Sequence, residues 1–249
     1  MSRIKDHLIG LCNERDEALC ALDGLEFDNS SALFYGYGTL IPPSLEFDHT
    51  FPHCGYYALL LTQLENIMDV ARLNGGHNFK RVVYGMAYSH SVTLLESYIS
   101  QSLVALATQY SNFATRITQH YDPSGAIKKY GWRKVLDSEG GLKGLVIEGL
   151  SKDVFHNLKT VKNVFGLMFD DAGKGIDIGP LEVVIERRHD IVHRNGTSVT
   201  GETFMVEFDM LKRDVMLIID FANDLKKRMT SSVLVEGVSI GIFPTPRFS

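Results

Sequence analysis

The chain has 249 residues, of which 45% are apolar, 22% charged and 10% aromatic. These are the values of a globular protein, and they exclude a largely disordered, collagenous or low-complexity chain. The formal net charge of −5 excludes an attraction for nucleic acid over the whole surface, although it leaves room for a local basic site. No run of about 18 apolar residues is present, so we expect no membrane-spanning helix.

Residues 1–55 are predicted to form an N-terminal helix, over residues 3–22, followed by an irregular extension. The first 20 residues carry early acidic side chains and no long apolar core, which is not the pattern of a signal peptide. The three cysteines are Cys12, Cys20 and Cys54. Their odd number and the lack of a C-x-x-C pair indicate neither a disulfide framework nor a zinc cluster. We therefore expect a cytoplasmic protein.

Four longer helices follow from apolar residues at intervals of three and four. The predicted spans are residues 56–73, 79–110, 154–168 and 208–225. Ser151 is the candidate N-cap of the third, and the Gly-containing stretch 171–175 ends it. In the fourth, Lys212, Arg213, Asp214 and Asn223 are expected outside the apolar stripe.

These elements predict an all-α, up-down helical bundle of four to six main helices with loop insertions. The bundle is expected over residues 56–230, and residues 231–249 form a C-terminal tail. Residues 122–149 are expected to be irregular with short helical pieces, and residues 202–206 to be briefly extended.

A fifth helix, residues 180–194, has the best-marked limits. Pro180 suits a first helical position, and Asn195-Gly196 suits a helix end. At about 100° per residue, Arg188 falls in the middle of an apolar stripe, and Arg187 and Asp190 are predicted to point away from that stripe. The stripe consists of Leu181, Val184, Ile185, Ile191 and Val192. His189 and His193 lie to one side of it as i, i+4 neighbours.

An arginine inside an apolar stripe must find a carboxylate or other acceptors, or face a cleft. Beside Arg188, two imidazoles can exchange protons near neutrality. A guanidinium can hold the oxygens of a phosphate, and an imidazole can act as general base or acid. The helix is therefore a candidate for phosphate chemistry.

The string Arg188-His189-Asp190-Ile191-Val192-His193 resembles the R-x4-6-H motif of the HEPN superfamily. SVTLLESYIS at 91–100 resembles the HEPN helix that packs beside the motif, and DVMLIIDFANDL at 214–225 resembles the last helix of that bundle. The likeness covers roughly residues 56–230 and is closest to the RiboL-PSP-like branch. It implies a small helical bundle that dimerises through the motif face, and a metal-independent endoribonuclease.

By this resemblance, Arg188 and His193 are catalytic and His189 has a supporting polar role at the catalytic site. Arg187, Arg194 and Asn195 are expected to bind substrate, and Glu96 and Asp190 to support the site. A neutral His193 would take the proton of the RNA 2′-hydroxyl while Arg188 stabilises charge on the attacked phosphate. His193 of a second subunit would protonate the leaving 5′-oxygen. The expected products carry 2′,3′-cyclic phosphate and 5′-hydroxyl ends, and no metal or cofactor is expected.

Other interpretations stay open. Arg188 could instead be a structural side chain paired with Glu96, and the two histidines could bind a metal, although no further ligands lie in a nearby motif. The stretch 171–175 lacks the full phosphate-loop pattern and is predicted to be a turn. A basic-aromatic cluster could add phosphate contacts and base stacking if RNA binds. Its members are Lys128, Lys129, Tyr130, Trp132, Arg133 and Lys134.

The leading hypothesis is thus a homodimeric ribonuclease, with RNA as its partner and, by analogy with the superfamily, a role as a toxin or in defence against phage. The first alternative is a non-catalytic HEPN module that binds RNA or nucleotide or acts as a dimerising adaptor. The second is a helical scaffold partnered with an antitoxin or effector chain.

Overall fold

The protein is described by a computed structural model, which covers residues 50–73, 75–120, 140–152, 155 and 157–239. The chain divides into two compact units, Phe47–Met229 and a second one made of Met1–Glu46 with Thr230–Ser249. The predicted N-terminal helix, Cys12, Cys20 and the basic-aromatic cluster at 128–134 lie outside the described residues. The helices considered below belong to the first unit, apart from the last turns of the C-terminal helix.

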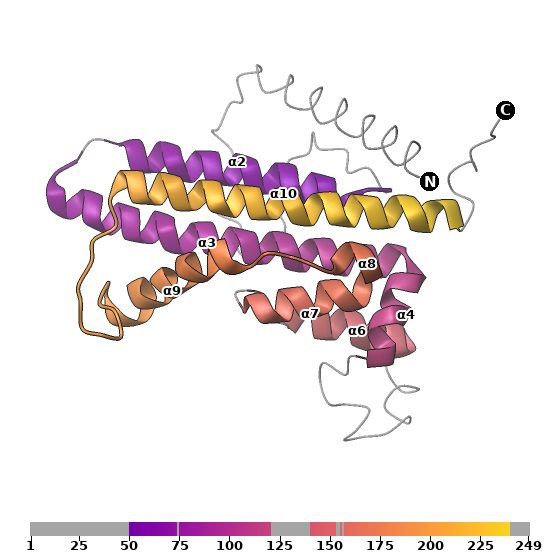
Figure 1. Cartoon of the computed structure of the whole chain (residues 1–249). Coiled ribbons are helices and arrows are strands. Elements are labelled where there is room, and N and C mark those ends of the chain that lie inside the picture. The colour runs from indigo at the N-terminus through magenta and orange to yellow at the C-terminus, as the bar shows by residue number, and fades with distance from the viewer. Residues whose placement is uncertain (1–49, 74, 121–139, 153–154, 156, 240–249) are drawn as a thin grey trace, which may run out of the picture. The chain divides into compact units, whose positions relative to one another are not determined.

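The described residues are predominantly helical, which confirms the all-α prediction (Figure 1). In chain order the helices are α2 (Pro52–Arg72), α3 (His77–Gln109), α4 (Ser111–His120), α6 (Gly141–Lys152), α7 (Leu158–Met168), α8 (Asp170–Gly173), α9 (Gly179–Arg194) and α10 (Phe208–Ser239). In place of a strand at 202–206, one isolated bridge joins Thr197 to Thr203. No helix in the described ranges combines the length and apolar character needed to cross a bilayer.

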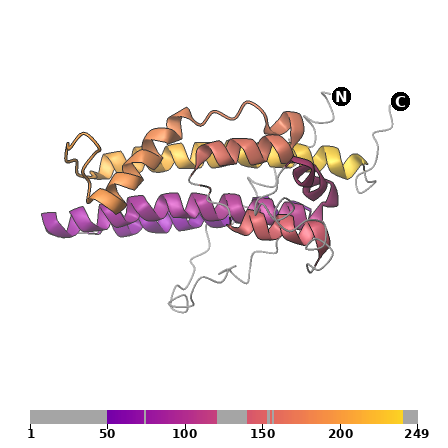
Figure 2. The ribbon, with the colours of Figure 1, turned by 90° about the horizontal axis from the view of Figure 1, so that it is seen from below.

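The core of the first unit is built around α3. Its buried side chains recur at helical spacing, and they include Tyr88, Val92, Leu95, Ile99 and Leu103. Figures 1 and 2 show α2 and α10 running along α3, while α9 crosses its N-terminal half. The Tyr98 ring packs edge-on against Tyr57 of α2 at 5.9 Å, and its hydroxyl donates to the Ala222 carbonyl of α10 at 3.3 Å. The helix α3 therefore contacts both α2 and α10.

The segment between α6 and α7 corrects one sequence prediction. Ser151 is not an N-cap, because it lies inside α6, where its hydroxyl donates to the Ile147 carbonyl at 2.8 Å. The cap of α7 is Asn157, whose side chain accepts from the Lys159 amide at 3.1 Å. After α7 the stretch 171–175 forms the end of the short α8 and a turn.

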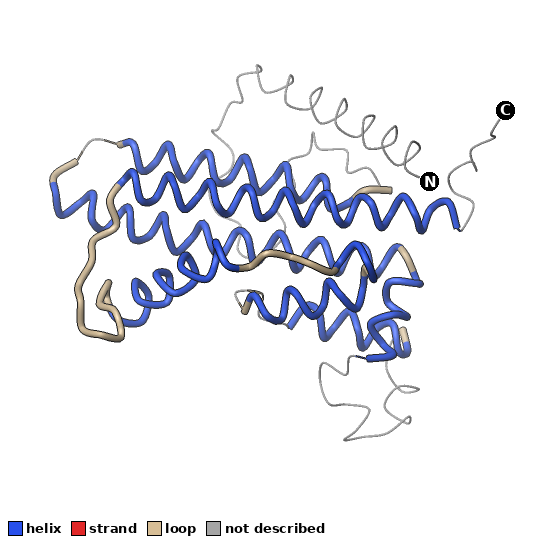
Figure 3. The backbone as a smooth tube through the Cα atoms, viewed as in Figure 1, coloured by secondary structure: helices blue, strands red, loops and turns tan. Residues whose placement is uncertain are grey.

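A long loop leads from α9 to α10, and Figure 3 shows it as the tan segment at the left of the molecule. The loop begins at Asn195, which is left-handed at φ 51°, and at Gly196, φ 79°. The Gly196 amide donates to the Asp190 carbonyl at 3.0 Å and so closes the helix. The predicted limits of this helix, Pro180 in its first turn and Asn195 at its end, are both confirmed.

Candidate functional site

The inward face of α9 is rotated relative to the predicted stripe. Leu181 and Val184 are buried as expected, but Val192 is exposed, so its placement in the core was wrong. Arg187 and Asp190 were predicted to point away from the apolar stripe that faces the bundle. They do the opposite, since Asp190 is buried and Arg187 is half-buried against α10. The face in contact with the bundle is therefore turned toward the Arg187 side of the helix.

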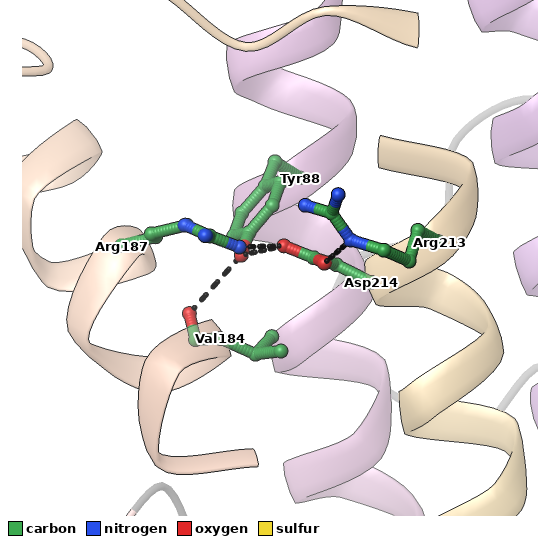
Figure 4. Close-up of polar contacts among 5 residues, drawn as sticks. All are labelled: Tyr88, Val184, Arg187, Arg213 and Asp214. Atoms are coloured by element: carbon green, nitrogen blue, oxygen red, sulfur yellow. Dashed lines mark hydrogen bonds and ion pairs between the residues drawn. The ribbon is translucent and has the colours of Figure 1, made fainter. Parts of the chain in front are cut away.

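Arg187 is drawn inward by a buried carboxylate. Asp214 of α10 is 2% exposed, and its Oδ2 accepts from Arg187 Nη1 at 2.6 Å and from the Tyr88 hydroxyl at 2.8 Å (Figure 4). Arg213 Nε lies 3.2 Å from the other oxygen, Oδ1. The expectation that Asp214 lies outside the apolar stripe of its helix was therefore wrong. The charge of Asp214 is compensated by Tyr88 of α3, Arg187 of α9 and the adjacent Arg213.

The cluster shifts the pKa values of Tyr88 and Arg187 upward. Burial raises the pKa of the Tyr88 hydroxyl well above its usual value, and the hydrogen bond to Asp214 and the charge of that carboxylate raise it further. Partial burial lowers the pKa of Arg187, but its hydrogen bond to Asp214 and the attraction of that carboxylate outweigh this effect, so the net shift is upward. A neutral phenol and a charged guanidinium thus share one carboxylate.

A second arginine of α9 is also paired. Arg194 Nη1 contacts Oδ1 of Asp190, which lies one turn earlier on the same helix. Arg187 and Arg194 were both expected to bind substrate, and each is engaged by a carboxylate of this chain. Asp190 holds Arg194 with its side chain, and its backbone carbonyl accepts the helix-closing bond from Gly196.

Arg188 differs from both of these arginines. It is half-buried, its Nε is shielded from solvent, and that Nε has no hydrogen-bond partner. No hydrogen bond or ion pair joins Arg188 to Glu96 or to another described residue. Glu96 lies on α3, a turn after Val92, and is half-buried. The structural alternative, an arginine neutralised by an acid, therefore describes Arg187 and Asp214, not Arg188 and Glu96.

The two histidines of the motif lie beside each other on the solvent side of α9. Both are exposed, and their ring centroids are 4.6 Å apart with the planes inclined by 47°. Their adjacency follows from the i, i+4 spacing. Asn195, one residue past the helix, is exposed and left-handed. In the described part of the chain, no three His, Cys, Asp or Glu side chains gather as a metal site.

Comparisons of the chain with protein-family models, with curated proteins and with solved structures find no match.

Sequence reasoning missed Asp214 and Tyr88, the two buried partners of Arg187. Asp214 stands three residues after Leu211 and one before Val215, so its spacing places it within the apolar stripe. That spacing was the available signal, because an acidic residue at a core position demands a cationic or hydrogen-bonding partner. Tyr88 gave no comparable signal, since an aromatic residue on a core helix needs no special explanation.

Proposed function

We propose that the protein is a metal-independent endoribonuclease, active as a homodimer, in which α9 carries the cleavage site. The observation that carries the proposal is Arg188, a half-buried arginine that has no carboxylate partner among the described residues and lies next to two exposed imidazoles. A buried cationic donor without an acceptor is costly, and an anionic ligand would supply the acceptor. The phosphodiester of RNA is such a ligand.

The chemistry needs only groups that RNA and α9 supply. His193 accepts the proton of the 2′-hydroxyl as that oxygen attacks the neighbouring phosphorus. The bond from phosphorus to the 5′-oxygen then breaks, and the leaving oxygen takes a proton from the protonated His193 of the second subunit. Arg188 stabilises the added negative charge on the non-bridging oxygens. His189, whose ring is tilted against that of His193, orients the His193 ring and contributes polar contact with the substrate.

Dimerisation is proposed because one copy offers little positive charge. Arg187 and Arg194 are bound to Asp214 and Asp190, so each protomer contributes Arg188 as the arginine of α9 with no acid partner. Exposed apolar side chains on α9 and on α3 could be covered by a second copy. They are Val183 and Val192 of α9 and Val82 and Met86 of α3, the last being 67% exposed. Two motif helices facing each other would double the local charge.

The test is an RNA cleavage assay on the full chain in the presence of a chelator, with the oligomeric mass measured by light scattering. We expect a dimer that yields 2′,3′-cyclic phosphate and 5′-hydroxyl ends and leaves DNA of the same sequence intact. Arg188→Ala and His193→Ala should each lower the rate about 100-fold or more. His90→Ala, which removes an exposed imidazole from α3, serves as the matched control and should retain the rate. A folded, dimeric Arg188→Ala protein that cleaves at the wild-type rate would refute the proposal.

A non-catalytic module that binds RNA or nucleotide, or acts as an adaptor, is the second candidate. The pairing of Arg187 and Arg194 within the chain favours it, because fewer arginines are then available to hold a long polyanion. It predicts RNA binding that weakens with Arg188→Ala and no cleavage by the wild-type protein. For the enzyme, we further propose a cytoplasmic role as a toxin or an antiviral effector, in which an antitoxin or effector chain could restrain it.

A further inference from the structure

One buried carboxylate of α10 joins the candidate cleavage helix to the rest of the bundle. Asp214 Oδ2 binds Arg187 Nη1 of α9 at 2.6 Å and the Tyr88 hydroxyl of α3 at 2.8 Å, as Figure 4 shows. The same hydroxyl lies 3.4 Å from the backbone carbonyl of Val184, one turn before Arg187 on α9. Three helices are thus tied at one point by directional polar contacts.

We propose that Asp214 is a positioning residue for the cleavage face of α9, acting through Arg187, an inference that rests on the proposed function. The apolar contacts of α9 alone define its rotation about its own axis poorly, since dispersion and burial are not directional. A guanidinium bound to a fixed carboxylate is directional.

The position of Arg187 sets the directions in which Arg188, His189 and His193 point from α9. With Arg187 held toward α10, Arg188 lies about 100° around the helix from it. His189 lies about 160° away in the other sense, and His193 about 120° away. This setting matches the exposure found, with Arg188 half-buried and both imidazoles exposed. Releasing Arg187 frees α9 to turn, which moves all three groups together.

Asp214 and Tyr88 are each 2% exposed, so neither can touch a bound RNA. An effect of either side chain on cleavage would therefore act through position. Arg213 provides an internal control because it contacts the same carboxylate, at 3.2 Å, from the same helix. Its side chain is 60% exposed, and losing it removes one ion-pair partner of Asp214 without releasing α9.

The experiment compares Asp214→Asn, Tyr88→Phe and the control Arg213→Gln in the full chain. We measure kcat and KM for RNA cleavage, the melting temperature, and the imidazole NMR resonances of His189 and His193, assigned with the corresponding His→Ala variants. Asp214→Asn should lower kcat about 10–100-fold with KM changed less than about 3-fold, and should move both sets of imidazole resonances. Tyr88→Phe should act in the same direction more weakly. Arg213→Gln should leave kcat and the resonances as in the wild type.

The outcomes separate this inference from the proposed function. If the wild-type chain cleaves no RNA, the proposed function fails, and the imidazole resonances alone decide whether Asp214 orients α9. If Asp214→Asn does not fold, Tyr88→Phe decides. Wild-type kcat and unmoved resonances in a folded Asp214→Asn or Tyr88→Phe protein would overturn the positioning role, as would an equal effect of Arg213→Gln. A purely structural ion pair would lower the melting temperature and leave the resonances of the folded protein unchanged.

Discussion

Two adjacent arginines on α9 should respond in different ways to the same substitution. Arg187→Ala removes a partner from a carboxylate that is 2% exposed, whereas Arg188→Ala removes a side chain that pairs with no acid in the described part of the chain. Both changes put alanine in the same helix at neighbouring positions, so the difference in helix propensity between arginine and alanine cancels in the comparison. The difference between the variants therefore reports the tertiary environment of each guanidinium.

The magnitudes follow from burial. Breaking a buried ion pair by removing one partner costs about 3–5 kcal/mol. Arg187 is 29% exposed, and Tyr88 and Arg213 still contact Asp214 after the substitution, so we expect a smaller loss of about 2–3 kcal/mol. Arg188→Ala gives up the packing of the arginine methylenes but also removes a buried donor that has no acceptor, and these effects nearly cancel to within about 1 kcal/mol.

The assay is urea unfolding followed by far-ultraviolet circular dichroism, with the slope m required to be the same in each variant. Arg72→Ala is the surface control, because its ion pair with Asp69 is exposed on both sides, and it should change the free energy of unfolding by less than about 0.5 kcal/mol. Equal losses for Arg187→Ala and Arg188→Ala, or a larger loss for Arg188→Ala, would contradict the assignment of one arginine to the bundle and the other to a ligand.

Four further substitutions test individual contacts elsewhere in the bundle. A Cβ at Gly173 would lie 1.9 Å from the Phe165 carbonyl oxygen, so Gly173→Ala should destabilise the protein by about 2–3 kcal/mol. A Cβ at Gly166 would meet no atom within 4 Å, so Gly166→Ala should stabilise the protein by about 0.5–1 kcal/mol. Thermal unfolding measures both, and melting-temperature shifts of the same sign would refute this reasoning. Burial, followed by the neighbouring carboxylate, raises the pKa of Tyr88, so the stability it contributes is complete below pH ~10 and is lost as the pH rises further. In Tyr88→Phe, the free energy of unfolding should therefore fall less steeply with pH above pH ~10 than in the wild type. Urea unfolding at a series of alkaline pH values measures this dependence, and an unchanged dependence on pH would contradict it. Asn157→Ala should cost about 1 kcal/mol by removing the cap of α7, and an unchanged urea midpoint would count against that role.

The helices could be predicted from the sequence because their signals are local. Apolar residues at spacings of three and four identified α2, α3, α7 and most of α10. The ends of α9 were the clearest, since Pro180 and Asn195 act on their own backbone and need no distant partner. The boundary between α6 and α7 was harder to predict from the sequence. A serine suits a helix cap, but its hydroxyl can also bond to a backbone carbonyl inside a helix, as Ser151 does.

The rotation of α9 could not be predicted in the same way. A helical wheel uses only the residues of one helix, and on the wheel of α9 both Arg187 and Asp190 fall away from the apolar stripe. The partner that draws Arg187 inward, Asp214, is 27 residues away on another helix. Only the folded bundle brings the two together, and the attraction of a buried carboxylate then outweighs the cost of partly burying an arginine.

The three arginines of α9 thus separate into two kinds. Arg187 pairs with Asp214 of α10, and Arg194 pairs with Asp190 one turn earlier on α9. Arg188 pairs with no carboxylate of the described ranges, so a ligand can bind to it without first displacing one of those acids. In a chain with a net charge of −5, this distinction matters more than the number of basic residues in the motif, since an arginine already neutralised adds little to the local potential. Under the proposed function, an anion near α9 would be recognised at Arg188, and a second copy of the chain would supply the further positive charge that a polyanion requires.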